Sequence, residues 1–556
     1  MHTTLQIKSI LGLMIGVITM SVFISACGQK VISHKAPREY VRGELDKLAP
    51  VEMKADLSRL SENDQKAVAR LMEAARIIDE LFLIQVSPSN PQIRSELQKS
   101  PANEDYLSLF NIMFGSWNRM EDERPFINKK AKPAGAGYYP EDMTKSEFET
   151  FLQENPELAA KFQNEFTVIR RREGKLVAVP YHEEYADKVR MISKLLDEAA
   201  KLTDDTSLKT FLQLRARDFL TDDFFESDMA WMDLTGDLEI VIGPYEVYED
   251  QLYGYKAAYE AFICVVDHAE SQKLEKTVAY LNEMEKNLPI DDKYKNFNRG
   301  TSSPIKVVQE IFSAGDTKAG IQTTAFNLPN DERVREAKGS KKVMLKNVAQ
   351  AKYEKCWIPI VNTILAEEPL QNVSFEAYFN HVLLHEISHG LGPGIITLEN
   401  GTQTTVSREL KELYPLIEEC KADILGMYNL LFLIDKGVFP ETMRKSAFAS
   451  YLGGMFRSIR FGINEAHGGG VAAQFNYMIE KGAFIADSAD KLSLDEARLE
   501  AAIRDLSRDV LIIEALGDYS AAEAFAQKYA VMTPLMERIV NSLIHVPIDI
   551  KPIFPI

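Results

Sequence analysis

Cysteine is scarce in this chain, with four among 556 residues, at Cys27, Cys264, Cys356 and Cys420. No two of them form a CxxC pair, so the sequence argues against a disulfide framework and against a thiolate metal site. Once the first is set aside as a lipid attachment site, as argued below, an odd number remains and cannot pair fully. Cys420 falls in a helical pattern, where a small buried hydrophobic side chain is expected.

Basic residues are in deficit: 64 lysines and arginines face 82 acidic residues, which gives a net charge of −18. Binding to nucleic acid or to an anionic membrane surface normally needs basic patches, so this balance argues against both. The 46% hydrophobic and 26% charged content excludes collagen-like and disordered chains. The length suffices for one large two-lobed protein or for two to four domains.

A long hydrophobic run is missing as well. The apolar run at residues 10–18 falls short of the ~20 residues that a membrane-spanning helix needs. It follows one cation, Lys8, and leads to small residues before Cys27, which is typical of a secretory signal. The segment Ile24-Ser25-Ala26-Cys27 resembles the lipobox of bacterial lipoproteins, in which the cysteine is acylated and becomes the first mature residue.

We therefore expect residues 1–26 to be a lipoprotein signal peptide and residues 27–45 to be a lipidated tether. The protein would then be exported and anchored in the bacterial cell envelope, on the periplasmic side or in the outer membrane. Its contact with the membrane would be only through the lipid on Cys27. The alternative for the same segment is an uncleaved membrane anchor.

Hydrophobic periodicity indicates helices first and strands later. Apolar residues at helical spacing follow Ser61, and helical patterns continue to about residue 230, with a Pro/Gly-rich break at 132–137. After residue 373 the pattern is again helical. Short β-branched runs between these two parts predict strands at 238–242, 262–266, 306–308, 323–326 and 342–345.

This pattern predicts an α+β protein that is predominantly α-helical and has two lobes. A mixed α/β lobe would span residues 46–370, and a helical lobe would span residues 371–556. Residues 266–300 are a segment that could join the helical lobe, which would make the mixed lobe discontinuous.

The segment His385-Glu386-Ile387-Ser388-His389 is an HExxH motif. Residues four apart lie on one face of a helix, so both imidazoles can bind one metal ion, with the glutamate beside a bound water. Ser374 is a plausible N-cap for this helix, and glycines follow His389 directly, as at a helix end. Solvated histidines on an ordinary helix are the alternative.

Catalytic zinc needs a third protein ligand and keeps a fourth position open. The best candidate is Glu419, in the segment Glu418-Glu419-Cys420-Lys421-Ala422-Asp423, about thirty residues after the motif. Asp423 is four residues later on the same face and would orient a ligand imidazole. A solvated acidic face is the alternative, but this helix is otherwise apolar. Glu386 would act as general base and acid, a role worth about 10²–10⁴-fold in rate.

At this point the chain resembles the dipeptidyl peptidase III family, zinc exopeptidases that release N-terminal dipeptides from short peptides. The resemblance rests on HEISH and on EECKAD, which is close to the family's EECRAE. Support comes from Gly243–Asp250, similar to its E-S-Y segment, from Asn327-Leu328-Pro329-Asn330, similar to its N-x-P-N segment, and from Glu465–Gly468, where the family places a catalytic histidine.

The resemblance implies a role for each matching residue. His385, His389 and Glu419 would hold one Zn²⁺ per chain, and Glu386 would be the general base. Glu418 and Asp423 would fix the imidazoles, and Tyr248 and His467 would donate to the oxyanion or the scissile amide. Glu246, Asn327 and Asn330 would bind the substrate's α-ammonium group, since a desolvated cation needs acceptors.

The family fold implied by this resemblance has a helical lobe that carries zinc and a mixed lobe with a small β-barrel, separated by a cleft. The chain departs from the family at several positions. Its first motif has five residues where HExxGH has six, Asp423 and Lys421 replace a glutamate and an arginine, and Glu249 stands where arginine is usual.

The sequence thus predicts a zinc dipeptidyl-peptidase acting on short peptides and not on nucleic acid. One alternative is a zinc endopeptidase or aminopeptidase with the same site. The other is a peptide-binding lipoprotein without catalysis, against which the intact Glu386 argues, because a binding module needs no base beside a metal.

Overall fold

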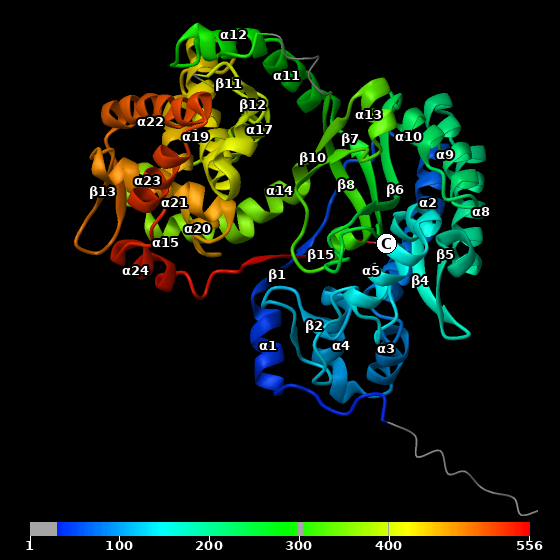
Figure 1. The fold of residues 1–556 in the computed structure, drawn as a ribbon. Coiled ribbons are helices and arrows are strands. Elements are labelled where there is room, and N and C mark those ends of the chain that lie inside the picture. The colour runs from blue at the N-terminus through cyan, green and yellow to red at the C-terminus, as the bar shows by residue number, and fades with distance from the viewer. Residues whose placement is uncertain (1–29, 298–303, 399, 556) are drawn as a thin grey trace, which may run out of the picture.

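The computed structural model describes residues 30–297, 304–398 and 400–555. The predicted signal peptide and Cys27 lie outside the described residues. Within these ranges, no helix combines the length and the hydrophobicity needed to cross a membrane. Figure 1 shows two lobes, one formed around a sheet and one formed almost wholly by helices.

The sheet of the mixed lobe contains all five strands that the sequence predicts. In spatial order they are β6 (Leu238–Glu246), β7 (Ala258–Val266), β8 (Ile305–Gly315), β10 (Lys341–Leu345) and β9 (Ala325–Leu328). Only β8 and β10 pair in parallel. β6 and β9 are the edge strands, so the predicted barrel is an open half-barrel. The predicted α+β class with two lobes is confirmed.

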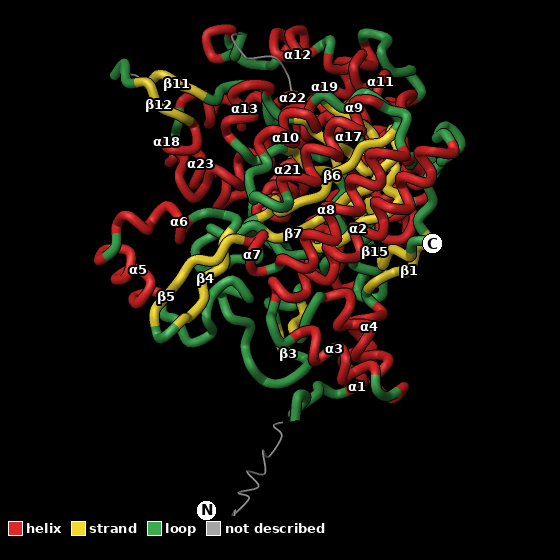
Figure 2. The backbone as a smooth tube through the Cα atoms, turned by 90° about the vertical axis from the view of Figure 1, so that its right-hand side faces the viewer, coloured by secondary structure: helices red, strands yellow, loops and turns green. Residues whose placement is uncertain are grey.

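Helices cover one face of this sheet, and its central strand β7 is buried along its whole length. Figure 2 shows α2 (Glu62–Val86), α8 (Ala186–Leu202) and α9 (Thr206–Asp218) on this side. α2 begins where the sequence predicts, because the Ser61 side chain accepts a hydrogen bond from the Asp64 backbone N–H.

The expectation of helices to residue 230 is wrong at two places, a short pair of strands at residues 117–125 and a longer hairpin. Residues 167–180 form a hairpin of β4 (Thr167–Arg172) and β5 (Lys175–Pro180). Its turn is Glu173-Gly174, and both residues have positive φ. The flanking segments are rich in β-branched residues, which form strands readily when a Gly-containing turn separates them.

The folded body begins earlier than predicted. Part of the expected tether forms α1 (Arg38–Asp46), whose Val41 is fully buried. It packs beside α4 (Glu104–Met113) in a small N-terminal module that also contains α3 (Asn90–Gln98). Next to this module, β1 (Leu48–Glu52) pairs in parallel with β15 (Asp549–Ile553).

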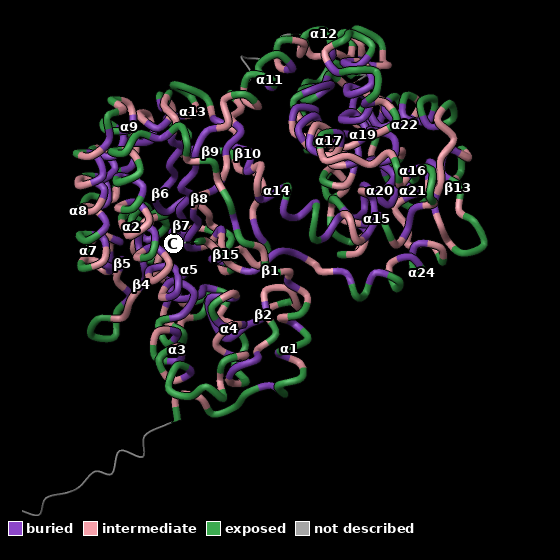
Figure 3. Tube along the Cα trace, turned by 180° about the vertical axis from the view of Figure 1, so that it is seen from behind, coloured by how far each residue is buried: buried purple, intermediate pink, exposed green. Residues whose placement is uncertain are grey.

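The helical lobe is built around one large hydrophobic cluster. Its principal helices are α17 (Phe375–Ser388), α19 (Tyr414–Asp435), α20 (Met443–Ile459), α21 (Ala466–Glu480) and α22 (Glu496–Leu516). The earlier helices α11 (His268–Val278), α12 (Leu281–Asn287) and α15 (Ile358–Ile364) also contribute buried residues to it. Figure 3 shows buried residues concentrated inside both lobes. The predicted lobe boundary near residue 370 stays a prediction.

The other elements are short. The remaining helices are α5 (Lys145–Glu154), α6 (Ala159–Gln163), α7 (Tyr181–Glu184), α10 (Phe225–Met232), α13 (Glu332–Lys338), α14 (Lys346–Lys352), α16 (Glu367–Leu370), α18 (Val406–Leu410), α23 (Tyr519–Tyr529) and α24 (Pro534–Ser542). The remaining strands are β2 (Trp117–Asn118), β3 (Arg124–Pro125), β11 (Ile395–Thr397), β12 (Gln403–Thr405), β13 (Phe484–Ala486) and β14 (Leu492–Leu494). Cys264, Cys356 and Cys420 are buried and unpaired, as expected.

Candidate metal centre

The HExxH residues lie at the C-terminal end of α17. The Ser374 side chain caps the start of the helix by accepting from the Ala377 N–H, as the sequence predicts. His385 and Glu386 occupy the last turn, and His389 is the C-terminal cap residue. The rings of His385 and His389 are 4.9 Å apart between centroids, so one helix end presents both imidazoles.

α19 packs closely against α17 because one of its residues has no side chain. A Cβ atom on Gly426 would lie 3.0 Å from the His385 backbone nitrogen. This approach brings the carboxylates of α19 to the imidazoles of α17. Asp423 Oδ1 lies 3.4 Å from His385 Nδ1, and Glu419 Oε2 lies 3.4 Å from His385 Nε2.

α21 supplies a third imidazole, again through a close approach of helices. The three glycines after His467 lie within α21, and a Cβ on Gly470 would lie 2.9 Å from the Cys420 nitrogen. The Glu465 side chain caps α21 by accepting from the backbone N–H groups of His467 and Gly468. His467 Nε2 then lies 3.2 Å from Glu419 Oε2.

His385, Glu419 and His467 form a group whose ligand atoms all lie within 4.8 Å of one another. Two ligands of one tetrahedral zinc, with bonds of about 2.0–2.1 Å, are separated by roughly 3.3 Å. The two distances from Glu419 Oε2 to the imidazole nitrogens, 3.4 and 3.2 Å, match this separation. Oε2 is buried and accepts no hydrogen bond from the described residues. A cation at the centre of the group would satisfy this oxygen, so the residues fit a metal ion.

His389 lies slightly farther from the group. Its Nε2 is 3.9 Å from Glu419 Oε1, while its Nδ1 lies 2.7 Å from Glu418 Oε1. His467 is oriented in the same way, with Nδ1 2.7 Å from Glu465 Oε1. A carboxylate that accepts from Nδ1 leaves Nε2 free to bind a metal ion. The prediction that His389 completes the ligand set stays a prediction.

Carboxylates and imidazoles lie close together in this group, and their interactions shift the pKa values of His385 and Asp423. Burial lowers the pKa of His385, but the neighbouring carboxylates of Asp423 and Glu419 outweigh it and raise this pKa to about 10. Burial raises the pKa of Asp423, but His381 and His385 outweigh it and bring the value to about 2. Metal binding needs a neutral imidazole, so it would be accompanied by release of a proton from this group.

Glu418 is held by two partners, as befits a residue that fixes an imidazole. Besides His389, it accepts from Lys421, whose Nζ lies 2.9 Å from Oε1. Burial raises the pKa of Glu418, but the bond to His389 and the charge of Lys421 outweigh it, giving a pKa of about 2. Lys421 therefore fills a cationic role here, where the family has arginine.

Glu386 has a partner that the sequence analysis missed. Lys342, on β10 of the mixed lobe, donates from Nζ to Glu386 Oε2 at 3.0 Å and to the Glu386 carbonyl at 2.9 Å. Burial raises the pKa of Glu386, but the charges of Lys342 and His385 outweigh it, and the pKa is lowered. Lys342 falls in a predicted strand, and no motif in the sequence links it to the HExxH helix.

A pocket of about 200 Å³ connects Glu386 to the edge of the sheet. Asn327 on β9 and Lys342 lie in paired register and both line it, with Leu383 of α17 on the opposite wall. The structure therefore brings the predicted substrate residue Asn327 and the predicted base into one cavity between the lobes.

The other predicted substrate residues, Glu246 and Asn330, lie together at the end of β6. Glu246 ends β6, and burial raises its pKa, against an opposing hydrogen bond from Asn330. Asn330 also donates from Nδ2 to the Tyr245 carbonyl at 3.0 Å. Tyr248 is 78% exposed, and no contact joins it to the metal group among the described residues.

Tyr248 is followed by two buried acidic residues that fix its loop. Glu249 makes ion pairs with Arg119 Nη1 at 2.9 Å and with Lys132 Nζ at 2.8 Å, and its side chain is 1% exposed. Asp250 accepts from the Tyr139 hydroxyl and from backbone N–H groups of its own loop. Burial raises the pKa of Glu249, but the two cations outweigh it and lower the pKa.

Replacing Glu249 with alanine is expected to lower the free energy of unfolding by about 3–5 kcal/mol, because it leaves the largely buried Arg119 without its ion-pair partner, whereas Lys132 keeps its pair with Glu123. Urea unfolding followed by circular dichroism measures this loss. Glu141→Ala is the control, since Glu141 and its partner Lys130 are 55% and 58% exposed, and a surface pair contributes about 0–1 kcal/mol. Equal losses in both variants would contradict the assignment.

Comparison with known proteins gives consistent results. The model of peptidase family M49 matches residues 157–404. The structure of DPP III from Caldithrix abyssi is 55% identical in sequence, with a TM-score of 0.90, over 92% of this chain and 98% of that chain. The structure of dipeptidyl-peptidase III from Corallococcus sp. strain EGB is 40% identical, with a TM-score of 0.77, over 94% of this chain and 98% of that chain.

A curated relative carries a different name. Nudix hydrolase 3 of Arabidopsis thaliana is 38% identical over an alignment of 573 positions, which covers 92% of this chain and 73% of that protein. The name denotes another class of hydrolase, whereas the family model and both solved structures are those of peptidases.

Proposed function

The chain belongs to peptidase family M49, the dipeptidyl peptidase III family of hydrolases, and on this premise we propose that it is a zinc-dependent peptidase that releases dipeptides from the N-terminus of short peptides. The observation that carries the proposal is the group of His385, Glu419 and His467, with Glu386 on the same helix turn as His385.

The donor set favours zinc, since imidazole nitrogens and one carboxylate suit this ion. We propose that His385, His389 and Glu419 hold it. His389 is 30% exposed and His467 is 58% exposed, so His389 is the better buried of the two remaining imidazoles. When bound, the ion would supply a Lewis acid and lower the pKa of a coordinated water to about 7.

Side chains of the protein carry out the other steps of the reaction. Glu386 takes the proton of the attacking water and passes it to the leaving amine. His467 and Tyr248 donate hydrogen bonds to the oxyanion or the scissile amide. Glu418 and Asp423 fix the imidazoles through Nδ1, which keeps each Nε2 directed at the metal.

The substrate's amino terminus would lie between β6 and β9, which Asn330 joins through its bond to the Tyr245 carbonyl. Glu246 supplies a carboxylate, and Asn327 and Asn330 supply amide oxygens, which together satisfy a desolvated ammonium group. The pocket that joins Asn327 to Glu386 supports this arrangement. Recognition of the ammonium group is what would make the enzyme an exopeptidase.

The test compares a dipeptidyl-arylamide with its N-acetylated form, using residues 28–556 with measured zinc content. Release of arylamine from the free substrate and not from the acetylated one supports the proposal. Equal cleavage of both would indicate an endopeptidase, and release of single residues would indicate an aminopeptidase. Bound zinc and bound peptide without turnover would indicate a peptide-binding protein.

Lys342→Met is expected to move the acidic limb of the pH profile of kcat/KM to higher pH. Lys342 lowers the pKa of Glu386, so its removal raises that pKa, and the base becomes protonated at a higher pH. Lys338→Met is a matched control, because the side chains of Lys338 and Lys342 are 28% and 27% exposed and Lys338 pairs with Asp233 instead. An unshifted limb would contradict this role.

We also propose that the protein is exported and held in the bacterial cell envelope by a lipid on Cys27, on the strength of the lipobox-like segment. Partition between detergent and aqueous phases tests this. The wild type is expected in the detergent phase and Cys27→Ser in the aqueous phase; an aqueous wild type would contradict the proposal.

A further inference from the structure

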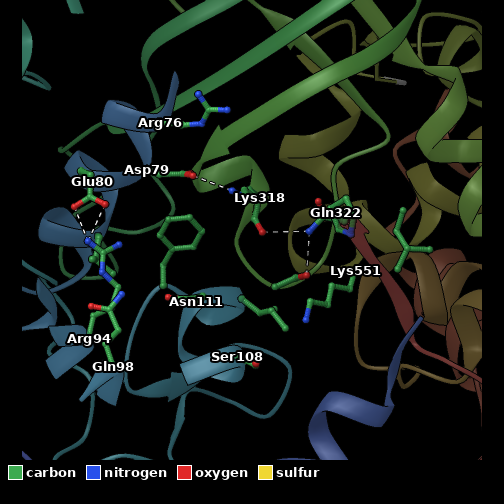
Figure 4. Close-up of a pocket in the computed structure, with 16 residues that line it drawn as sticks. Arg76, Asp79, Glu80, Arg94, Gln98, Ser108, Asn111, Lys318, Gln322 and Lys551 are labelled. Carbon is green, nitrogen blue, oxygen red and sulfur yellow. Dashed lines mark hydrogen bonds and ion pairs between the residues drawn. The ribbon is translucent and has the colours of Figure 1, made fainter. Parts of the chain in front are cut away.

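A second cavity lies away from the metal centre, where the N-terminal module meets the mixed lobe. Its volume is about 510 Å³, within the range of small-molecule sites. α2, α3 and α4 form one side, and the segment after β8 together with β15 forms the other (Figure 4). None of the residues assigned to peptide hydrolysis lines it.

The ionised groups of this cavity leave an excess of positive charge. Two acidic side chains line it, and each is neutralised by a cation of the same cavity. Asp79 pairs with Lys318 at 2.8 Å, and Glu80 pairs with Arg94 at 2.6 Å, as the dashed lines in Figure 4 show. Arg76 and Lys551 also line the cavity, and neither has an ion pair among the described residues. The lining therefore carries two uncompensated cations in a protein whose net charge is −18.

Neutral polar groups add to this excess. The side chains of Gln98, Ser108 and Asn111 line the cavity, and within the described ranges none has a hydrogen-bond partner in the protein. A guanidinium, an ammonium, a hydroxyl and amide groups are the donors with which proteins bind phosphate and carboxylate oxygens. No unpaired acid competes with a ligand for these donors.

The remaining wall is apolar. Leu83 and Phe114 from the helices and Ile550 from β15 line the cavity beside the polar groups. Phe114 and Ile550 are at least 95% buried, so they belong to a rigid part of the wall. A cavity of this composition suits a ligand with an apolar body and charged ends rather than a bare inorganic ion.

We propose that this cavity is a binding site for a small organic dianion, a phosphate monoester or a dicarboxylate, held by Arg76 and Lys551. The two cations come from opposite sides of the cavity, Arg76 from α2 and Lys551 from β15. The ligand therefore ties β15 to the helix beneath the sheet. Because it binds the folded state only, it raises the thermal stability of the protein.

Isothermal titration calorimetry of the metal-loaded protein tests the proposal. Adenosine 5′-monophosphate is the phosphate monoester and glutarate is the dicarboxylate, so the two titrations distinguish the two kinds of ligand. At least one of the two is expected to bind and to raise Tm. Arg76→Gln and Lys551→Ala are each expected to weaken binding at least about tenfold, as the loss of a charge-assisted hydrogen bond requires.

Arg190→Gln and Lys355→Ala are the controls, since both residues are exposed and lie outside the cavity. They are expected to leave the dissociation constant unchanged. Thermal melts of the variants without ligand identify any that fail to fold. If Lys551→Ala fails to fold, Lys551→Gln is used in its place. Binding of neither compound, or binding that survives both cavity substitutions, would overturn the proposal.

Discussion

Glu386→Gln is expected to lower kcat on a dipeptidyl-arylamide by about 10²–10⁴-fold, the usual contribution of a general base. Glutamine keeps the size of the side chain and can still accept from Lys342, but it cannot take a proton from water. Glu386 follows His385 without lying among the ligating atoms, so the metal content is expected to stay at the wild-type level. Steady-state kinetics and metal analysis of the same samples measure both quantities.

Glu376→Gln is the matched control, because Glu376 is an exposed glutamate at the other end of the same helix. It is expected to change kcat by less than a factor of two or so, as surface substitutions usually do. A wild-type kcat in Glu386→Gln would show that Glu386 is not the general base. Loss of the metal from Glu386→Gln would indicate that Glu386 binds the metal rather than transfers a proton.

Glu419→Ala is expected to abolish both metal binding and activity. Glu419 contributes the one oxygen shared by the ion-pair contacts of His385 and His467, and this oxygen is buried without a hydrogen bond. Three protein ligands are what a catalytic zinc site normally has, so loss of the only carboxylate leaves imidazoles alone. Dialysed protein is expected to retain less than about a tenth of the wild-type metal, in keeping with metal affinity that depends on every ligand.

A second readout separates lost metal from a lost fold. Chelation of the wild type is expected to lower its Tm, because the metal binds only the folded state, whereas Glu419→Ala is expected to show no such shift. Asp435→Asn, at the exposed end of the same helix, is expected to behave as the wild type does. Stoichiometric metal in Glu419→Ala would contradict the ligand assignment.

Most residues of the candidate metal centre could be proposed from the sequence because they lie close together along the chain. His385 and His389 are four residues apart on one helix, and Glu419 and Asp423 are four apart on another, so helical periodicity alone places each pair on one face. The strands of the sheet were predictable for a similar reason. β6 and β7 are buried on both faces, and such strands are continuous hydrophobic runs that stand out in a sequence.

What the sequence did not predict depends on residues far apart along the chain. Lys342 reaches Glu386 only because the mixed lobe packs against the end of α17, and no local pattern records that packing. The position of Glu419 beside two imidazoles depends on Gly426 and Gly470, which allow three helices to approach closely. Glu249 could be recognised as a departure from the family, but Arg119 and Lys132, which compensate it, come from another module.

The pairing of β1 with β15 has a consequence for how the protein is made. Leu48 pairs with Asp549, so ribosomes add about 500 residues between the two strands, and a contact of such sequence separation forms late. Asp549 also makes an ion pair with Lys352 and accepts from the Gln322 N–H, so this strand fastens segments from three regions of the chain. A growing polypeptide must therefore leave β1 and its neighbours incomplete until β15 has been synthesised.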